Sequence, residues 1–478
     1  MKLEDMLKNT TLKHFYKISK IPRGSGNEEE ISNYIYNWAL SKGLYANQDS
    51  YNNLIIKKEN NSSKNPIILQ AHLDMVCEKN VNSNHDFLKD PIDWSIVDNY
   101  IKASNGTTLG ADCGIGVALI MTMLEKENEN FPPIEAIFTT REETDLAGAY
   151  NINTNLINSD RIINLDISPE NKILLGSSGG FACEANLDVN FEDYGGQTFE
   201  INLFNMHGGH SGHDINKGYG NPIILITDLY NRIKDTGVDC RLVSIEGGNS
   251  RLAIPREASL KFCSKDLQID EIINPIVSNF SNYMYRKFSN CSNNIKLTLN
   301  KIYNHKVLSE KDEFRLIELI ELIPNGINEM DSRFDGLVES SSNLGIVKFI
   351  NEQISLIEEI RFVYKESGEQ ILNKIEALSR IYNFHIKVHS KYPSWISSKK
   401  SNLCQKTIDI YKSLYNSEPI VTASHSGNEV AILMESLNLT DAIAIGPTRQ
   451  YYHTPNEILD CRSAINFEKY LECILKEI

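Results

Sequence analysis

Imidazole and carboxylate side chains stand just beyond the ends of several apolar runs in this chain of 478 residues. The apolar runs are residues 67–71, 134–140, 162–165 and 442–446. The polar set consists of His72, Asp74, Asp112, Glu142, Glu143, Asp166 and His453. In an open α/β sheet, chemistry gathers outside the carboxyl ends of the strands. Converging imidazoles and carboxylates form an N/O ligand set suited to zinc or a similar first-row divalent ion. We therefore predict a metal-dependent hydrolase.

The positions of these residues suggest a different chemical role for each. Asp112 lies centrally among the others in the sequence, and a carboxylate between two metal ions can bridge them. Adjacent glutamates at a strand end point in opposite directions, so one of Glu142 and Glu143 can bind metal while the other takes a proton from an activated water. Asp74 follows His72 by two residues and shares its side of an extended chain, which places it to accept the second imidazole N–H.

Each position also has a simpler explanation. A lone His-x-Asp is more often a structural hydrogen bond, and adjacent glutamates are commonly a solvated loop. Asp166 could be a helix N-cap, since Ser168-Pro169-Glu170 follow it, and His453 could cap Thr454-Pro455. The conjunction of several such strand ends in one chain favours the metal site over these alternatives.

The helices and strands that must position these residues follow two different patterns along the chain. Helical spacing before Pro22, a capping-box pattern at Ser25–Glu28 and a second amphipathic helix open the chain. Strands and helices then alternate to about residue 166, which is typical of a mostly parallel sheet. Residues 110–116 form a glycine-rich turn before an apolar helix at 117–124, and the glycines permit the close backbone approach that a metal-bridging loop needs.

Residues 187–393 combine short alternating strands with helices, which indicates an inserted α+β domain. Residues 222–232, 309–322 and 356–365 are expected to be helices. We therefore expect a catalytic α/β domain in two parts, 1–186 and 394–478, with the insertion between them.

Composition sets further bounds. The length predicts two or more domains. The net charge of −15 argues against a nucleic-acid partner, which would need a basic face. No apolar run is long enough for a signal peptide or a membrane span. Nine cysteines without paired spacing are typical of reduced thiols, so we expect a cytoplasmic protein.

Several motifs resemble the M20 metallopeptidases, and specifically their aminoacyl-histidine dipeptidase branch (Xaa-His dipeptidases, or bacterial carnosinases). These motifs run in order along almost the whole chain. They are residues 69–76 (LQAHLDMV), 108–112 (TLGAD), 138–143 (FTTREE), 207–212 (HGGHSG), 248–257 (GNSRLAIPRE), 338–345 (VESSSNLG) and 445–448 (IGPT).

The resemblance implies a phosphorylase/hydrolase-like zinc peptidase domain interrupted by a lid, and two Zn²⁺ per chain, for which Co²⁺ or Mn²⁺ can substitute. It implies that His72 and Asp166 bind one zinc, that Glu143 and His453 bind the other, and that Asp112 bridges them. Glu142 would be the general base, Asp74 would orient His72, and His210 of the lid would stabilise the oxyanion. The substrate would be a free dipeptide, and the cavity that forms when the lid closes would select for that length.

Three further residues are candidates for substrate binding. Arg361 and Asn343 are candidates for holding the substrate carboxylate, although an arginine on a helix is more often solvated. His425 belongs to the segment HSGNE, which follows the family pattern only in part, and this segment is expected to line the pocket. Further departures are Cys113, where this branch usually has asparagine, and Arg141, where an acidic residue is common.

Three functions remain open on these residues. The favoured one is a metal-dependent dipeptidase that accepts Xaa-His. An aminotripeptidase or N-acyl amino acid hydrolase would keep the metals and change the substrate. A non-catalytic peptide-binding relative would have no physical need for Glu142. A homodimer is compatible with the family, and the sequence does not settle the preferred metal or dipeptide.

Overall fold

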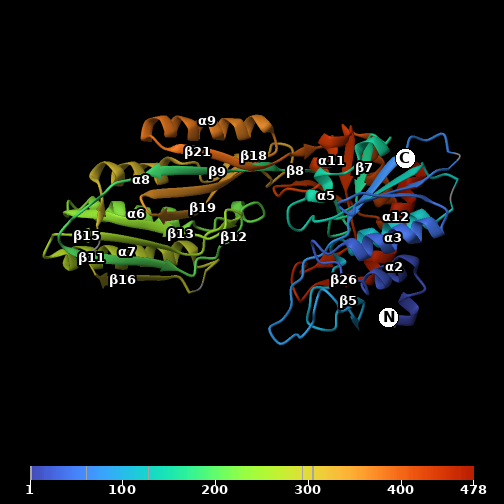
Figure 1. Ribbon diagram of the computed structural model, residues 1–478, viewed down its shortest axis with the longest axis horizontal. Helices are drawn as coiled ribbons and strands as arrows, with labels where there is room; N and C mark the ends of the chain where they lie inside the picture. The colour runs from blue at the N-terminus through green and yellow to red at the C-terminus, as the bar shows by residue number, and fades with distance from the viewer. Residues whose placement is uncertain (1–2, 61, 128, 293, 304–305) are drawn as a thin grey trace. The chain divides into compact units, whose positions relative to one another are not determined.

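The computed structural model describes residues 3–60, 62–127, 129–292, 294–303 and 306–478 (Figure 1). The chain divides into two compact units. The first comprises Met1–Ser177, Trp395–Ala423 and Asn428–Ile478, and the second comprises Ser178–Ser394 and Ser424–Gly427. The second unit therefore begins earlier than the predicted insertion, and it includes a short segment near residue 425 that the prediction assigns to the catalytic domain.

A nine-stranded mixed sheet forms the centre of the first unit, in the order β1-β2-β6-β3-β7-β24-β8-β22 with β23 paired to β8. Its middle strands, β6, β3, β7 and β24, run parallel, and the outer pairs are antiparallel. The strands are β1 (Tyr45–Gln48), β2 (Leu54–Lys58), β3 (Ile67–His72), β6 (Ile134–Thr139), β7 (Arg161–Asn164), β8 (Lys172–Ser177), β22 (Trp395–Ile396), β23 (Ile420–Ser424) and β24 (Asp441–Ala444). β3 and β6 are buried along their whole length, which explains their mostly apolar sequences, and their polar members Gln70 and Glu135 are buried too.

Helices pack around the sheet, most of them through an apolar stripe. α2 (Thr10–Ile18) buries Leu12, Phe15 and Ile18 and is capped by Asn9, whose side chain accepts from the Leu12 amide. α4 (Ala111–Glu125) is buried on all sides and packs on β3. The other helices of this unit are α1 (Leu3–Met6), α3 (Glu29–Ser41), α5 (Ala147–Tyr150), α10 (Asn402–Tyr415), α11 (Val430–Leu437) and α12 (Cys461–Glu477), with a 3₁₀ turn, η1 (Thr154–Leu156).

The predicted capping box at the start of α3 is wrong. Glu28 occupies the N-cap position without a side-chain cap, and Ser25 donates its hydroxyl to Asp74 instead, at 2.6 Å. A second, antiparallel sheet of four strands completes the unit: β25 (Arg449–Gln450), β26 (Ile458–Asp460), β5 (Tyr100–Ala103) and β4 (Trp94–Val97).

The second unit is an antiparallel nine-stranded sheet in the order β16-β11-β15-β13-β19-β20-β9-β21, with β18 paired to β19. Helices α6, α7, α8 and α9 pack their apolar stripes into the core of this sheet. The elements are β9 (Gly179–Asp188), β10 (Phe191–Glu192), β11 (Gln197–Phe204), β12 (Gly209–His210), η2 (Ile215–Lys217), α6 (Pro222–Lys234), β13 (Cys240–Gly247), β14 (Ala253–Ile254), β15 (Ala258–Ser264), α7 (Ile269–Phe288), β16 (Lys296–Ile302), β17 (Val307–Leu308), α8 (Glu310–Leu322), β18 (Gly326–Met330), β19 (Val338–Ile350), β20 (Gln353–Phe362), α9 (Lys365–Tyr382) and β21 (His385–Tyr392).

The predicted helix at 356–365 is wrong, since β20 occupies most of it. Ile354, Leu356 and Ile360 alternate along this strand and enter the core of the unit. Isoleucines and leucines at short spacings fit both a helix and a buried strand, and pairing with β19 and β9 on either side decides for the strand.

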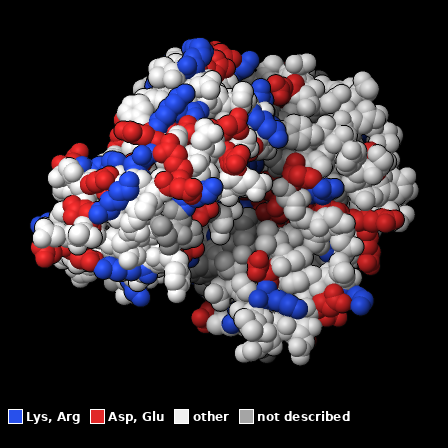
Figure 2. Space-filling view, turned by 60° about the vertical axis from the view of Figure 1, so that its left-hand side comes forward, with Lys and Arg blue, Asp and Glu red and all other residues white. Residues whose placement is uncertain are grey.

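Charged side chains are spread over the surface. On the face in Figure 2, lysines and arginines lie scattered among aspartates and glutamates. Every helix of the described residues is too short or too polar to serve as a membrane-spanning segment.

Candidate metal centre

The parallel strands of the first unit end beside one another and bring the predicted residues together. His72 is the last residue of β3, which pairs with β6 on one side and β7 on the other. Glu142 and Glu143 follow the end of β6, and Asp166 follows the end of β7. No helix begins between β7 and β8 in the described residues, which removes the N-cap alternative for Asp166.

Asp112 lies between two imidazoles. Its Oδ1 is 3.4 Å from His72 Nε2, and its Oδ2 is 3.4 Å from His453 Nε2. The His72 Nε2 is also 3.6 Å from Asp166 Oδ2, and the His453 Nε2 is 2.9 Å from Glu143 Oε1. The side chains therefore form two triads that share one carboxylate, which is the arrangement a bridging aspartate requires.

Two buried atoms of this cluster lack hydrogen bonds. His72 Nε2 and Glu143 Oε1 are shielded from solvent, and each has only ion-pair contacts, the shortest with Asp112 at 3.4 Å and with His453 at 2.9 Å, in place of a well-aligned hydrogen bond. Such unsatisfied groups are rare and call for an explanation, of which an absent ion is one. The donor set of imidazole nitrogens and carboxylate oxygens fits zinc and similar divalent ions. The residues present therefore fit a pair of divalent cations.

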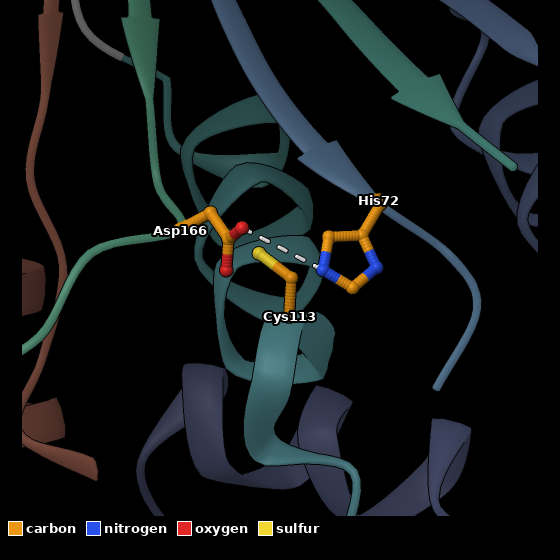
Figure 3. Close-up of side chains that lie close together, drawn as sticks. All are labelled: His72, Cys113 and Asp166. Carbon is orange, nitrogen blue, oxygen red and sulfur yellow. Dashed lines mark ion pairs between the residues drawn. The ribbon is translucent and has the colours of Figure 1, made fainter. Parts of the chain in front are cut away.

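The Cys113 thiol lies beside His72 and Asp166 (Figure 3). The potential ligand atoms of these three residues all lie within 4.8 Å of one another. The thiol nevertheless donates to the Leu165 carbonyl at 3.5 Å. Burial raises the pKa of Cys113 well above its ordinary value, so this thiol stays protonated unless it binds a metal ion as a thiolate.

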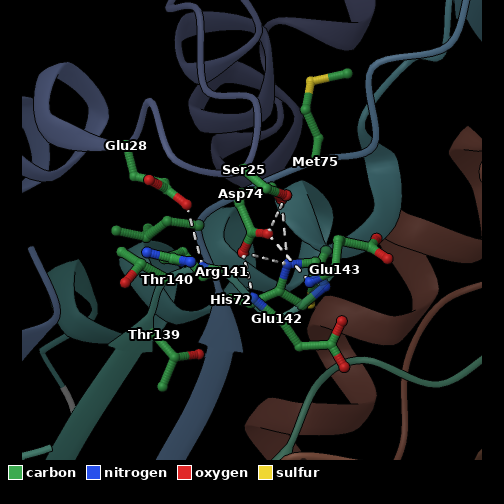
Figure 4. A network of polar contacts seen from close by, with 12 residues as sticks. Ser25, Glu28, His72, Asp74, Met75, Thr139, Thr140, Arg141, Glu142 and Glu143 are labelled. Carbon is green, nitrogen blue, oxygen red and sulfur yellow. Dashed lines mark hydrogen bonds and ion pairs between the residues drawn. The ribbon is translucent and has the colours of Figure 1, made fainter. Parts of the chain in front are cut away.

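Asp74 organises the strand ends around it (Figure 4). Its Oδ1 lies 3.4 Å from His72 Nδ1, which hydrogen-bonds to the main-chain carbonyl of Asp74 at 3.1 Å, and accepts the Glu142 amide at 3.0 Å. Its Oδ2 accepts the Glu143 amide at 3.2 Å and the Ser25 hydroxyl at 2.6 Å. The carboxylate and the carbonyl of Asp74 together thus hold an imidazole and both glutamates, which is more than the imidazole contact predicted for this residue.

The imidazoles of the cluster are held in their charged form. Burial would lower the pKa of His72, but Asp166 and Asp112 raise it well above its ordinary value. Against the effect of burial, close contacts with the carboxylates of Asp112 and Glu143 raise the pKa of His453 to about 10. Burial and the neighbouring Asp112 raise the pKa of Asp166 to about 8. The protons on these groups therefore balance negative charge within the cluster. A divalent cation that bound there would displace them.

Glu142 has the properties of a general base. Burial raises the pKa of Glu142 well above its ordinary value, and Glu143 and Glu429 shift it in the same direction. Glu429 is itself buried and accepts hydrogen bonds from Gln70 at 2.5 Å and Thr139 at 2.7 Å. A carboxylate with a raised pKa can take up a proton near neutral pH and give it back. Arg141, the adjacent departure from the family pattern, pairs with Asp145.

Buried charges that the sequence analysis missed hold the loop that carries Asp112. Arg23 donates to the carbonyls of Leu73 and Asp74 at 2.8 and 3.2 Å, and also to the carbonyl of Gly110. Gly110 has a φ of 71°, and a Cβ there would collide with the Arg23 guanidinium. Glu457 accepts the amides of Leu109, Gly110 and Asp112 at 2.8–3.1 Å. No local pattern marks these two charged residues, because their partners are backbone groups far away in the sequence.

A third missed residue is Arg449, in β25. Its guanidinium donates to Asp112 at 2.9 Å and to Asp166 at 3.1 and 3.2 Å. Sequence reasoning passed over Arg449, which stands four residues before His453.

His210 lies in the second unit, at the end of β12. Its Nδ1 accepts the amides of Gly212 and His213 at 3.0 and 3.2 Å. Burial and the nearby Arg361 lower the pKa of His210 to about 3. The ring is therefore neutral near pH 7 with its proton on Nε2, which leaves an N–H donor on the far side of the ring.

Arg361 is buried, in contrast to the solvated arginine that a helix would give. It donates through Nε and Nη2 to Ser211 at 3.2 and 3.1 Å, and through Nη1 to the Tyr392 hydroxyl at 2.8 Å. Tyr392 in turn donates to Glu359 at 2.9 Å. Partners on several sides fix the plane of this guanidinium.

The other two residues predicted to bind substrate, Asn343 and His425, lie in the same unit. Asn343 donates both amide hydrogens to backbone carbonyls, those of Arg251 and Ala253, at 2.9 and 2.8 Å. This geometry supports a structural role for Asn343 and speaks against a contact with a substrate carboxylate. His425 Nε2 is 2.7 Å from the Ser341 hydroxyl, and burial together with Arg361 lowers the pKa of His425 to about 3.

Comparisons with known proteins agree with this geometry. The sequence pattern of Peptidase family M20/M25/M40 matches residues 68–477. The chain is 32% identical to the cytosol non-specific dipeptidase of Escherichia coli (strain K12), over 97% of this chain and 96% of that protein. Among solved structures, the aminoacylhistidine dipeptidase from Vibrio alginolyticus matches with a TM-score of 0.87 and 28% identity, over 98% of this chain and 96% of that one.

A tripeptidase from Staphylococcus aureus shares the fold at a TM-score of 0.56 and 14% identity, over 98% of this chain and 97% of that one. Metal dependence is typical of the family. The fold class and the family predicted from the sequence are confirmed. The chain belongs to peptidase family M20/M25/M40 and is a peptide-bond hydrolase of that family.

Proposed function

We propose that this protein is a metal-dependent dipeptidase that cleaves free dipeptides, Xaa-His among them. The observation that carries the proposal is the pair of triads that share Asp112, with Glu142 beside them. The names of the two relatives with 28% identity or more, a non-specific dipeptidase and an aminoacylhistidine dipeptidase, support the substrate class.

Five side chains would hold two divalent ions, zinc by preference and cobalt or manganese as substitutes. His72 and Asp166 would hold one ion, Glu143 and His453 the other, and Asp112 would bridge them. When bound, the two ions would supply Lewis acidity and lower the pKa of a water molecule toward neutrality. Asp74 keeps the His72 imidazole in one orientation, as such outer carboxylates do for ligating histidines.

Glu142 would move the proton. In its ionised form it accepts a proton from the attacking water, and in its protonated form it gives that proton to the leaving amine. The raised pKa of Glu142 suits the second step, because burial favours the protonated form that gives its proton to the leaving amine. Glu143, whose amide is held by the other oxygen of Asp74, points its own carboxylate toward His453.

The second unit would bind the substrate and stabilise charge. The Nε2–H of neutral His210 is a donor suited to the oxyanion of a tetrahedral intermediate. Arg361 offers a planar, buried guanidinium for the C-terminal carboxylate of the dipeptide. His425 stays a candidate for the pocket lining. The predicted closure of this unit as a lid remains part of the proposal, as does a possible homodimer.

A cytosolic location is the remaining part of the proposal, and the name of the Escherichia coli relative supports it.

A substrate panel tests the proposal. Chelator-treated protein, reloaded with Zn²⁺ or Mn²⁺, is incubated with free dipeptides that include Xaa-His and β-Ala-His, with tripeptides and with N-acetylated dipeptides. Glu142→Gln, which keeps the shape and removes the base, serves as the matched control. Chelator-sensitive cleavage restricted to free dipeptides, absent from the control, is the expected result. Turnover of only tripeptides or acylated substrates would point to the alternative enzymes, and no turnover by the metal-loaded protein would point to a peptide-binding relative.

A further inference from the structure

Arg449 places a buried positive charge against two of the proposed metal ligands. Its Nη1 donates to Asp112 Oδ1 at 2.9 Å and to Asp166 Oδ1 at 3.2 Å, and its Nη2 donates to Asp166 Oδ1 at 3.1 Å. The side chain is only 2% exposed. A guanidinium remains charged in any protein environment, so this charge cannot be removed by deprotonation when a metal ion arrives.

The backbone of Arg449 is held in place. The Ser168 hydroxyl accepts the Arg449 amide and donates to the Arg449 carbonyl, both at 2.8 Å. Pairing between β25 and β26 fixes the same residue from another side. Nη1 also lies 3.3 Å from the Ala111 carbonyl. With its main chain clamped and its head group bonded at several points, Arg449 is not placed to swing out of the cluster.

The charge acts on one side of the cluster. Arg449 contacts Oδ1 of Asp112, the oxygen that faces His72, whereas Oδ2 faces His453. Its other carboxylate partner is Asp166, the second residue beside His72. The position between His72 and Asp166 therefore has a fixed cation beside it, and the position between Glu143 and His453 is served by the opposite oxygen of Asp112.

We propose that Arg449 makes the two metal positions unequal. The position at Glu143 and His453 fills first, and the position at His72 and Asp166 binds a divalent ion more weakly than it would without Arg449. Two effects of the guanidinium act in this direction: it repels a second cation nearby, and its hydrogen bonds occupy oxygens that would otherwise be ligands. Changes around metal ligands commonly alter affinity about 10–100-fold, and we expect a difference of that size between the two positions. This inference rests on the proposed two-ion site.

The test measures metal binding itself. Chelator-treated protein is titrated with Zn²⁺ in competition with a chromophoric chelator, and bound zinc is counted by mass spectrometry after dialysis at fixed free zinc. The wild type is expected to show two affinities at least about 10-fold apart. Arg449→Met, which keeps a long apolar stem without charge, is expected to strengthen the weaker affinity about 10–100-fold. Arg449→Lys keeps a positive charge and is expected to leave the weaker affinity low.

Arg462→Met is the matched control, because it removes one positive charge from an exposed position at the start of α12. It should leave both affinities unchanged. Two equal affinities in the wild type would overturn the inference. A weaker affinity that falls or stays the same in Arg449→Met would also overturn it, since Arg449 would then serve to orient Asp166 as a ligand.

Two ligand variants test the order of filling without altering Arg449, and so hold even if Arg449→Met fails to fold. Asp166→Asn should abolish the weaker binding and spare the tighter one, while Glu143→Gln should do the reverse. The opposite pattern would overturn the inference. The outcome is separate from the proposed function: unequal zinc sites in a protein that cleaves no dipeptide would refute the dipeptidase and leave the inference standing.

Discussion

Replacing Asp74 with asparagine tests how one buried carboxylate holds both halves of the candidate metal centre. Its two oxygens receive the amides of Glu142 and Glu143, and Oδ1 also faces His72. Asparagine has one acceptor oxygen and an NH₂ group that can only donate. In either orientation of the amide, a backbone N–H of the glutamate pair therefore meets another donor.

The size of the effect follows from the burial of these groups. Leaving a buried donor without an acceptor costs about 1–3 kcal/mol. A second argument gives a similar value. Burial opposes ionisation of Asp74, but the hydrogen bond and charge of His72 lower its pKa from 3.8 to about 2. A depressed pKa of a carboxyl group stabilises the fold above the unfolded value near 4, and this stabilisation of about 2 kcal/mol is lost as the pH falls through 2.

We therefore expect Asp74→Asn to lower the free energy of unfolding of the first unit by about 2 kcal/mol at pH 7 and to weaken zinc binding about 10–100-fold. Urea unfolding of metal-free protein can be followed by tryptophan fluorescence, because Trp38, Trp94 and Trp395 all lie in the first unit. Ser25→Ala is the matched control, since it removes one hydrogen bond to the same carboxylate and keeps its charge. Stability within about 0.5 kcal/mol of wild type and zinc affinity within about threefold would refute this account of Asp74.

Three further variants test other groups. Glu142→Gln should lower kcat about 10²–10⁴-fold with zinc content unchanged, and a normal rate would remove Glu142 as the general base. His210→Ala should lower kcat about 10²–10³-fold with little change in KM; an effect confined to KM would instead indicate ground-state binding. Glu358 of β20 is fully buried without a hydrogen-bond partner, and burial raises its pKa well above the ordinary value. Wild type should therefore lose stability relative to Glu358→Gln as the pH rises from about 4.5 to 8, by at least about 1 kcal/mol, measured by amide hydrogen exchange in β9 and β20. A difference that does not change with pH would contradict a neutral, buried Glu358.

The strand ends could be predicted from the sequence because buried strands are rich in apolar residues and polar residues follow directly after them. β3 and β6 are buried on both faces, so their sequences are mostly apolar up to the polar residues that follow, with Gln70 and Glu135 as the interior exceptions. Their parallel pairing then brings His72 and the glutamate pair to one edge of the sheet. The family motifs, which occur in the same order along the chain, supplied the role of each residue as metal ligand or general base. The strand pattern alone does not distinguish these roles.

Other features could not be predicted because they depend on partners far away in the sequence. Apolar residues at 354–360 are compatible with a helix until β19 and β9 pair with them on both sides. Ser25 has the spacing of a cap, but its hydroxyl reaches Asp74 across the fold. The charges of Arg23 and Arg449 look like ordinary surface charges in the sequence, and only the fold places them in the interior.

Those buried charges join the loops that carry the proposed metal ligands. Arg23 ties the Gly110 carbonyl to the carbonyls just after His72, and Glu457 ties the amides of the same loop to the segment that carries His453. The strand end, the bridging loop and the His453 loop are therefore connected through the chain's own side chains. In small metal domains the ion supplies the folding free energy. Here buried hydrogen bonds also hold the loops, so a fixed cation such as Arg449 can lower the free energy of ion binding, as we propose, without dismantling the site.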